Sequence, residues 1–312
     1  MSSTQDSPTQ HLRDQESQST PGESSPSAEP PESQTTVEDD ENWGNNGHES
    51  DYSDDDASET EERFPYSVEE FVAIFTEFYQ FLAKLHYDPA NLKFPPPGGW
   101  PQLPPEHVGT WKEDFALDVI RHLPYFAWGS PATQLDYKSH LVDYSYGPRF
   151  FDGVDWRDED MDDEEPFNTG MCFVIAEGHE SGGQQWVLDV EHGVITVDSL
   201  RCDTNGPFDL REFFEGIMDK YRKLELISSP GRVTLDGSRV AERAERIKEE
   251  EVMAEKRWFR DADVDLQFLK QVYRDHGWPD SFRREECREY IDDFMMKLEK
   301  TRGESWEADY KM

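Results

Sequence analysis

The segment Glu177-Gly-His-Glu-Ser-Gly-Gly183 holds the residue types in this chain that are best suited to chemistry. A histidine between carboxylates, as His179 is between Glu177 and Glu180, can bind a metal ion or act as a general base. No second histidine cluster or cysteine pair completes a zinc ligand set, and Ser181 lacks the glycine two positions earlier that a nucleophile elbow requires. Glycines that let two strands reverse explain the segment without chemistry. We therefore expect a turn, with no catalytic residue, metal or cofactor.

An acidic stretch over residues 152–165 offers a second pattern. Asp158, Asp160 and Asp162 alternate as at the start of a calcium-binding loop, which uses closely spaced oxygen ligands. The positions that would hold the loop glycine and the bidentate glutamate carry other residues, so the pattern favours a solvated acidic loop.

Ser53, Ser58 and Thr60 are candidate phosphorylation sites, because each is followed by carboxylates of the kind that acidophilic kinases recognise. Phosphorylation there would deepen the negative charge. The same composition is typical of a solubilising tail, and the sequence leaves both readings open.

Two tryptophans are candidate contacts with a partner. Trp100 and Trp278 each lie in a Gly-Trp-Pro setting, where a loop can present a large aromatic anchor. Trp186 lies in an expected strand, so we place it in the interior. The predicted partner contacts are thus Trp100 and Trp278, joined by Glu177, His179 and Glu180 of the loop.

The elements that must position these residues follow from hydrophobic patterning. Order is expected to begin near Phe64. Ser67 and Glu70 fit a capping box, and apolar residues at helical spacing from Phe71 to Leu85 predict the helix that follows it. Three strands are expected around two turns, over 171–176, 184–190 and 194–197. Met171 to Ala176 is apolar on both faces, which predicts a central strand covered on both sides.

The remaining patterns are weaker. We expect helices over about 105–122 and 209–226, and one strand within 135–144. After the break at 228–231, the sequence predicts a solvated helix over 238–260 and a packed helix around Leu266 to Tyr273. The turn Gly277-Trp-Pro279 precedes a last helix, for which Asp280 or Ser281 is the expected N-cap and which extends past Leu298.

Composition limits the class of partner. There are 31 Lys and Arg against 69 Asp and Glu, a net charge of −38, which disfavours nucleic acid and anionic lipid and favours basic proteins. Residues 1–62 have almost no aliphatic side chains and are expected to be disordered. Cys172, Cys202 and Cys287 show no paired spacing, which indicates reduced thiols. The absence of a leader or a long apolar run predicts a protein of cytoplasm or nucleus.

Six short segments stand out: Gly99–Pro101, Arg121–Tyr125, Leu141–Tyr144, Ile175–Gly183, Leu188–Ile195 and Gly277–Asp280. Together they resemble a family of uncharacterised filamentous-fungal proteins over roughly residues 64–300. The order of the predicted elements is more remotely similar to the SUKH superfamily: a helix, a strand, a strand ending in Leu-Asp-x-x-x-Gly, a short strand and an amphipathic helix. That superfamily includes fungal cell-wall-assembly regulators and bacterial immunity proteins. The resemblance implies an α+β domain that binds other proteins and lacks a catalytic centre.

The predicted architecture is α+β, an antiparallel sheet packed by helices. It divides into a disordered acidic tail (1–62), the α+β domain (63–230), a helical extension (231–300) and a flexible C-terminus (301–312). The predicted function is a non-catalytic binding or regulatory module with an acidic surface. The alternatives are a hydrolase using His179 with nearby carboxylates, and an acidic chaperone of basic proteins.

Overall fold

The computed structural model describes residues 64–103, 112–127, 134–147, 169–200, 202–257, 263–303 and 306. These residues all belong to one compact unit, Glu59–Met312. The expected acidic tail over 1–62 and the acidic loop over 152–165 lie outside the described residues.

Helix α1 (Val68–Leu85) begins at the expected capping box. The Glu70 amide donates to the Ser67 hydroxyl at 3.3 Å, and the Ser67 amide donates to the Glu70 carboxylate at 2.8 Å. These bonds satisfy two of the amide groups that a helix start leaves without intrahelical partners. The helix buries the predicted apolar stripe, which comprises Phe71, Ile74, Phe75, Phe78, Leu82 and Leu85.

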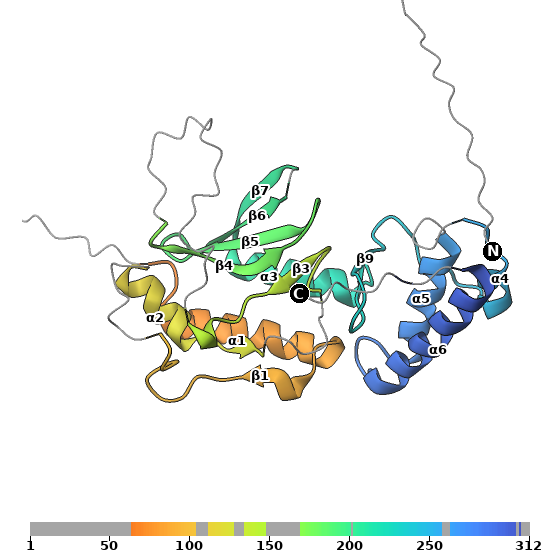
Figure 1. Cartoon of the computed structure of the whole chain (residues 1–312), viewed down its shortest axis with the longest axis horizontal. Helices are drawn as coiled ribbons and strands as arrows, with labels where there is room; N and C mark the ends of the chain where they lie inside the picture. The colour runs from red at the N-terminus through yellow and green to blue at the C-terminus, as the bar shows by residue number, and fades with distance from the viewer. Residues whose placement is uncertain are drawn as a thin grey trace, which may run out of the picture. The chain divides into compact units, whose positions relative to one another are not determined.

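A five-stranded antiparallel sheet forms the centre of the fold; the antiparallel sheet was predicted, but only four of its strands were. Its strands are β3 (Ser139–Leu141), β4 (Cys172–Gly178), β5 (Gln184–Asp189), β6 (Val194–Ser199) and β7 (Thr204–Asp209), in that spatial order (Figure 1). Every residue from Met171 to Ala176 is at most 6% exposed, so the central hexapeptide is buried on both faces. The expectation on which the architecture rests is confirmed.

Helices α1 and α3 (Leu210–Arg222) cover the sheet face that carries Trp186. The Trp186 ring meets Phe213 of α3 edge-on at 4.7 Å, and Phe78 of α1 stacks on Phe214 at 4.1 Å. Asp209 caps α3 by accepting from the amides of residues 211 and 212. Aromatic burial of this kind dominates core energetics, so the α+β fold is held by the pairing of these two helices with the sheet.

Strand β7 is absent from the sequence prediction. Its segment, Thr-Asn-Gly-Pro-Phe-Asp, has no alternation of apolar and polar residues, and five of its six residues are exposed. It lies at the sheet edge, where Pro207 is tolerated because a backbone nitrogen that faces outward has no neighbouring strand to donate to, so the missing N–H of proline costs no hydrogen bond. Edge position therefore explains why patterning missed this strand.

Two elements before the central strands are shorter than expected. Helix α2 (Asp114–His122) begins nine residues later than the predicted start at about 105, and residues 104–111 lie outside the described range. Lys112 instead donates from its buried ammonium to the carbonyl of Thr169 at 2.9 Å. The strand expected within 135–144 is limited to β3, and a 3-10 turn, η3 (Tyr144–Tyr146), follows it.

Short paired segments complete the first part of the chain. A 3-10 turn, η1 (Pro89–Asn91), leads into β1 (Leu92–Lys93), which pairs with β2 (Tyr125–Phe126). Further along, β8 (Leu226–Ile227) pairs with β9 (Leu235–Asp236). Both pairs are antiparallel two-residue ladders.

The predicted helix over 238–260 is wrong for most of its length. Residues 237–248 are not helical, and α4 (Glu249–Met253) is the one helix in the part of this range that the structure describes, which ends at residue 257. The reason is that side chains of α5 (Asp263–Asp275) hydrogen-bond to the backbone of this segment. Lys270 donates to the carbonyls of Gly237 and Val240, and Gln271 donates to those of Arg243 and Glu245. Those carbonyls obtain from α5 the donors that an α-helix would have supplied.

Helix α6 (Arg284–Arg302) is the last helix of the described residues. Its N-cap is Arg283, without a side-chain cap, so the expected caps Asp280 and Ser281 are wrong. Arg302 forms an ion pair with Asp265 at 3.0 Å, with side chains 4% and 0% exposed. Trp306 is 1% exposed, so the prediction of a flexible C-terminus over 301–312 does not fit this residue. Residues 304–305 and 307–312 lie outside the described range.

The helices after residue 231 bond to the α+β part at several points. Tyr273 donates to the Ser228 carbonyl at 2.6 Å, and Arg284 donates to the carbonyls of Ala83 and Tyr87 at 3.0 and 2.8 Å. The boundary at 230 therefore stays a prediction about folding units. All three cysteines are free thiols; Cys172 and Cys287 are buried, and Cys202 is exposed.

Candidate functional site

The loop that the sequence marked for chemistry forms the turn after β4. The His179 amide donates to the Lys138 carbonyl at 2.9 Å, and the Glu180 carboxylate pairs with the Lys138 ammonium at 2.8 Å. Gly183 is required here, because a Cβ at that position would lie 2.3 Å from the His179 carbonyl oxygen. The glycines therefore allow a close backbone approach, as a turn demands.

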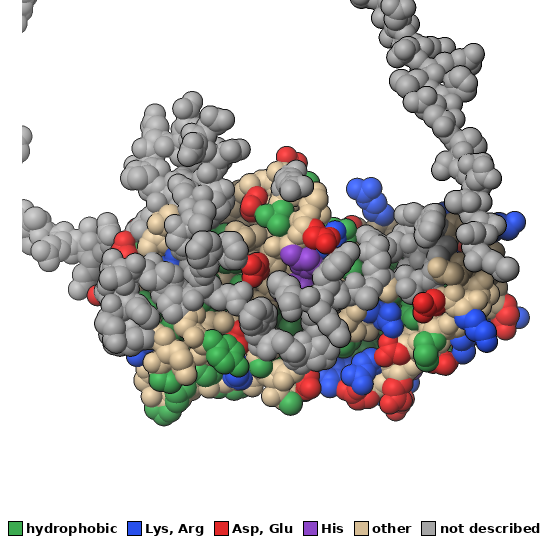
Figure 2. All heavy atoms as spheres, in the orientation of Figure 1, with side chains coloured by type: hydrophobic (Ala, Val, Ile, Leu, Met, Phe, Trp, Pro, Cys, Tyr) green, Lys and Arg blue, Asp and Glu red, His purple; other side chains and the backbone are tan. Residues whose placement is uncertain are grey.

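His140 is a neighbour of this loop that sequence reasoning missed. It lies in β3 opposite Glu177 of β4, and its ring stacks on that of His179 with centroids 4.9 Å apart. The only signal for this pairing was the expected strand within 135–144, whose register the sequence did not define. Glu177, His179 and Glu180 thus meet His140 and Lys138 across two strands. Histidine side chains are visible at one place on the face shown in Figure 2.

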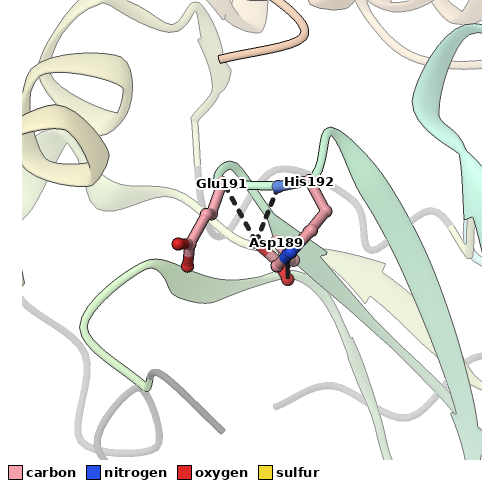
Figure 3. Close-up of side chains that lie close together, drawn as sticks. All are labelled: Asp189, Glu191 and His192. Atoms are coloured by element: carbon pink, nitrogen blue, oxygen red, sulfur yellow. Dashed lines mark hydrogen bonds and ion pairs between the residues drawn. The ribbon is translucent and has the colours of Figure 1, made fainter. Parts of the chain in front are cut away.

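A second group of potential ligands lies in the turn between β5 and β6. Asp189, Glu191 and His192 bring three ligand atoms within 4.8 Å of one another, and they are the one such set among the described residues. Asp189 accepts from the amides of Glu191 and His192 and pairs with the His192 ring at 2.8 Å (Figure 3). The hydrogen bond to Asp189 raises the pKa of His192. These contacts are those of an aspartate that closes its own turn.

Trp100 lies in a different setting, within a cluster of aromatic rings and one lysine. The Trp100 indole donates to the Leu123 carbonyl at 2.9 Å, which fixes the proline-rich segment around it. Lys93 places its ammonium 5.7 Å from the Trp100 ring centroid and 4.5 Å from that of Tyr146. Asp143, whose side chain is fully buried, holds the same ammonium at 2.7 Å. We call Lys93, Trp100 and Tyr146 the aromatic patch.

Tyr146 is the most exposed large apolar residue described, at 70%, and Phe94, next to Lys93 in the chain, is 53% exposed. Lys93 and Tyr146 are far apart in sequence and meet because η3 and β1 are joined through Asp143. The sequence indicated Trp100 but not Lys93 or Tyr146. A single tyrosine after a short strand has no pattern from which its exposure could be predicted. Exposed aromatic side chains held on a rigid scaffold are typical of protein-contact sites.

Trp278, by contrast, is a core residue. It is 4% exposed, its indole donates to the Tyr221 carbonyl at 2.9 Å, and its ring contacts Phe81 and Phe282. The prediction that Trp278 contacts a partner is therefore wrong for this structure. The candidate phosphorylation sites Ser53, Ser58 and Thr60 lie outside the described residues, as do Asp158, Asp160 and Asp162.

The acidic charge is unevenly distributed along the chain. Residues 63–230 hold 30 acidic and 13 basic side chains, whereas residues 231–312 hold 21 and 17. Acidic and basic groups are interspersed over the region of α5 and α6 in Figure 2. The excess of carboxylates therefore belongs to the tail and to the part of the chain that carries the sheet.

Comparison with protein-family models, curated proteins and solved structures finds no match to this chain. Among the helices in the described ranges, none combines the length and the apolar character needed to cross a membrane.

Proposed function

We propose that this chain is a non-catalytic binding or regulatory module of cytoplasm or nucleus, which binds a partner protein with a basic surface. The aromatic patch is the observation that carries the proposal. Its exposed ring, Tyr146, is held by a lysine that is itself fixed to the buried Asp143. A pre-ordered aromatic anchor loses little conformational entropy on binding, which is why tyrosine and tryptophan are enriched at the centres of interfaces.

Charge supports the choice of a basic partner. The excess of acidic side chains over residues 63–230 would draw a basic protein toward the patch and speed the encounter. Long-range attraction of this kind weakens as salt rises, because the Debye length falls to about 8 Å at physiological ionic strength. The remote resemblance of the sequence pattern to the SUKH superfamily would imply the same class of function.

The test compares three forms of the full-length chain, immobilised and exposed to a native lysate. The forms are the wild type, Tyr146→Ser, and Phe208→Ser as a matched control, because Phe208 is an aromatic residue 43% exposed at another place, in β7. We expect a set of basic proteins to be retained by the wild type and the control and lost with Tyr146→Ser. Identical retention by all three would reject the patch.

Two further arms address the electrostatic argument. Retention should fall between about 50 mM and about 300 mM salt if charge steers binding. Deleting residues 1–62 should leave retention largely unchanged. Loss of retention on that deletion would instead favour the chaperone hypothesis, in which the acidic tail itself binds basic proteins.

A hydrolase is the second candidate, and the stacked rings of His140 and His179 favour it. Two imidazoles with Glu177 nearby could share a proton-transfer role. Hydrolysis of p-nitrophenyl acetate by the wild type, abolished in both His140→Gln and His179→Gln, would support this alternative. Equal rates in all three forms would exclude a role for the pair in ester hydrolysis.

A further inference from the structure

A cavity of about 270 Å³ lies among α5, α6 and the non-helical segment before α4. It contains none of the loop or patch residues discussed above. Its lining is drawn from three separate stretches of chain and comprises Arg246, Ile247, Phe268, Gln271, Val272, Asp275, His276, Arg283 and Tyr290.

One wall of the cavity is the segment 243–247, whose backbone is hydrogen-bonded to the Gln271 side chain of α5. The Gln271 amide donates to the carbonyls of Arg243 and Glu245, each at 2.8 Å, and its oxygen accepts from the Ile247 amide at 3.0 Å. Both N–H donors of the Gln271 side chain are thus used in holding the segment 243–247 against α5. The wall is therefore a fixed part of the fold.

The floor of the cavity is apolar and its rim carries two arginines. Ile247, Phe268 and Val272 are 2%, 5% and 4% exposed. Arg246 and Arg283 lie at the rim, with side chains 75% and 50% exposed. An apolar floor with a few convergent polar groups is the usual composition of a small-molecule site.

The rim arginines retain N–H groups for a ligand. Arg246 pairs with Asp275 at 2.7 Å, and Arg283 donates to the Glu286 carboxylate and to the Asp275 carbonyl, both at 2.8 Å. Each guanidinium carries five N–H donors, so these contacts leave several unused. Asp275 is the single carboxylate among the lining residues, against two guanidinium groups.

His276 adds a polar group whose orientation is defined. Its Nδ1 lies 2.7 Å from the Val272 carbonyl, which can only accept, so Nδ1 carries the proton and the neutral ring has its lone pair on Nε2. Tyr290 donates to Glu249 at 2.7 Å, so its hydroxyl proton is already engaged. The donors that remain for a ligand are therefore those of the two arginines.

We propose that this cavity binds a small organic anion with a flat apolar body, of the aryl carboxylate class. The ring system would lie on Ile247, Phe268 and Val272, and the carboxylate would accept from Arg246 and Arg283. Guanidinium and carboxylate groups match in geometry, since parallel N–H groups meet both oxygens.

The probe is naphthalene-2-carboxylate, with naphthalene-2-carboxamide as its neutral counterpart of the same shape. Titration calorimetry on the full-length chain should give one site with a Kd on the order of 1 mM or tighter for the carboxylate. The carboxamide should bind at least about fivefold more weakly, because it lacks the charge that the arginines recognise.

Three variants locate the site. Arg246→Gln and Arg283→Gln should each weaken the carboxylate about fivefold and leave the carboxamide unchanged. Arg288→Gln is the matched control, because Arg288 is 47% exposed on the same helix, α6, and does not line the cavity. All three residues are at the surface, so the folded state should survive each change, which a thermal melt verifies.

The proposal is overturned if no saturable binding occurs, if carboxylate and carboxamide bind equally, or if Arg288→Gln weakens binding as much as the two rim variants do. Binding of both probes with equal affinity would show an apolar pocket without anion selectivity.

Discussion

Replacing His86 should change the pH dependence of stability. His86 follows α1, is 4% exposed, and its ring lies 5.3 Å from that of Tyr221. Burial lowers the pKa of His86 from 6.5 to about 3, the backbone of Gln134 opposes the shift, and the charge of Arg284 adds to it. The imidazole is therefore neutral in the fold at any pH at which the protein is ordinarily handled.

The sign of the effect follows from which state binds the proton. Between pH 6.5 and about 3 the unfolded chain protonates His86 and the folded chain does not, so stability falls as the pH falls through this window. Each pH unit corresponds to about 1.36 kcal/mol. At about pH 5, which is about 1.5 units below the unfolded value, His86 costs about 2 kcal/mol.

The substitution that tests this is His86→Leu, because leucine has a similar volume to histidine and does not titrate. Urea unfolding of the full-length chain, followed by tryptophan fluorescence at about pH 7.5 and about pH 5, gives the free energy of unfolding at each pH. The difference between variant and wild type should shift in favour of the variant by about 2 kcal/mol on acidification. A difference that is unchanged with pH would refute the reasoning.

His192 supplies a control of opposite sign. Its pKa is raised by the hydrogen bond to Asp189, so its contribution to stability is full below the unfolded pKa and is lost as the pH rises through the folded value. His192→Gln should therefore be more harmful at about pH 5 than at about pH 7.5. A shift in the same direction as that of His86→Leu would indicate a cause common to both variants.

Three further predictions concern the helices after residue 231. Arg302→Met should cost about 3–5 kcal/mol in urea unfolding, because it removes the guanidinium that pairs with the buried Asp265 carboxylate, and a cost below about 1 kcal/mol would contradict a buried pair. Lys270→Met should cost about 2–3 kcal/mol and speed amide hydrogen exchange in residues 237–248, whereas unchanged exchange there would mean that the ammonium does not hold the segment. Trp306→Ala should lower the free energy of unfolding by about 3–5 kcal/mol, because the indole is buried. Met296→Ser, at a residue 64% exposed, is the control and should change it by less than about 0.5 kcal/mol. Equal effects of the two substitutions would place Trp306 at the surface.

Patterning predicted the elements whose signals are local. The capping box of α1 needs only residues 67–70, and the burial of Met171 to Ala176 on both faces follows from six consecutive apolar residues. Such signals are contained in the chain segment itself, because helix caps and strand faces depend on near neighbours.

The misses share a dependence on distant residues. The segment 237–248 has helical composition but is held open by Lys270 and Gln271, about thirty residues later in the chain. Trp278 resembles an exposed loop residue by its Gly-Trp-Pro setting, yet its indole finds the Tyr221 carbonyl. A polar partner far along the chain has no periodic signature, so neither contact could be predicted.

The candidate site divides in the same way. Glu177, His179 and Glu180 were recognisable because they are contiguous, and Trp100 because of its prolines. Tyr146 was not, because its place beside Lys93 depends on Asp143 holding η3 and β1 together. An exposed aromatic residue becomes meaningful only when its neighbours in space are known.

Hydroxyl-radical footprinting of the full-length chain, free and bound to a partner captured by the wild type, is the most direct measurement of the proposed interface. Modification of Tyr146 should fall on binding, while the exposed Phe208 and Met296 should react as in the free chain. Protection of Phe208 or Met296 with Tyr146 still fully reactive would contradict the assignment of the aromatic patch as the contact surface.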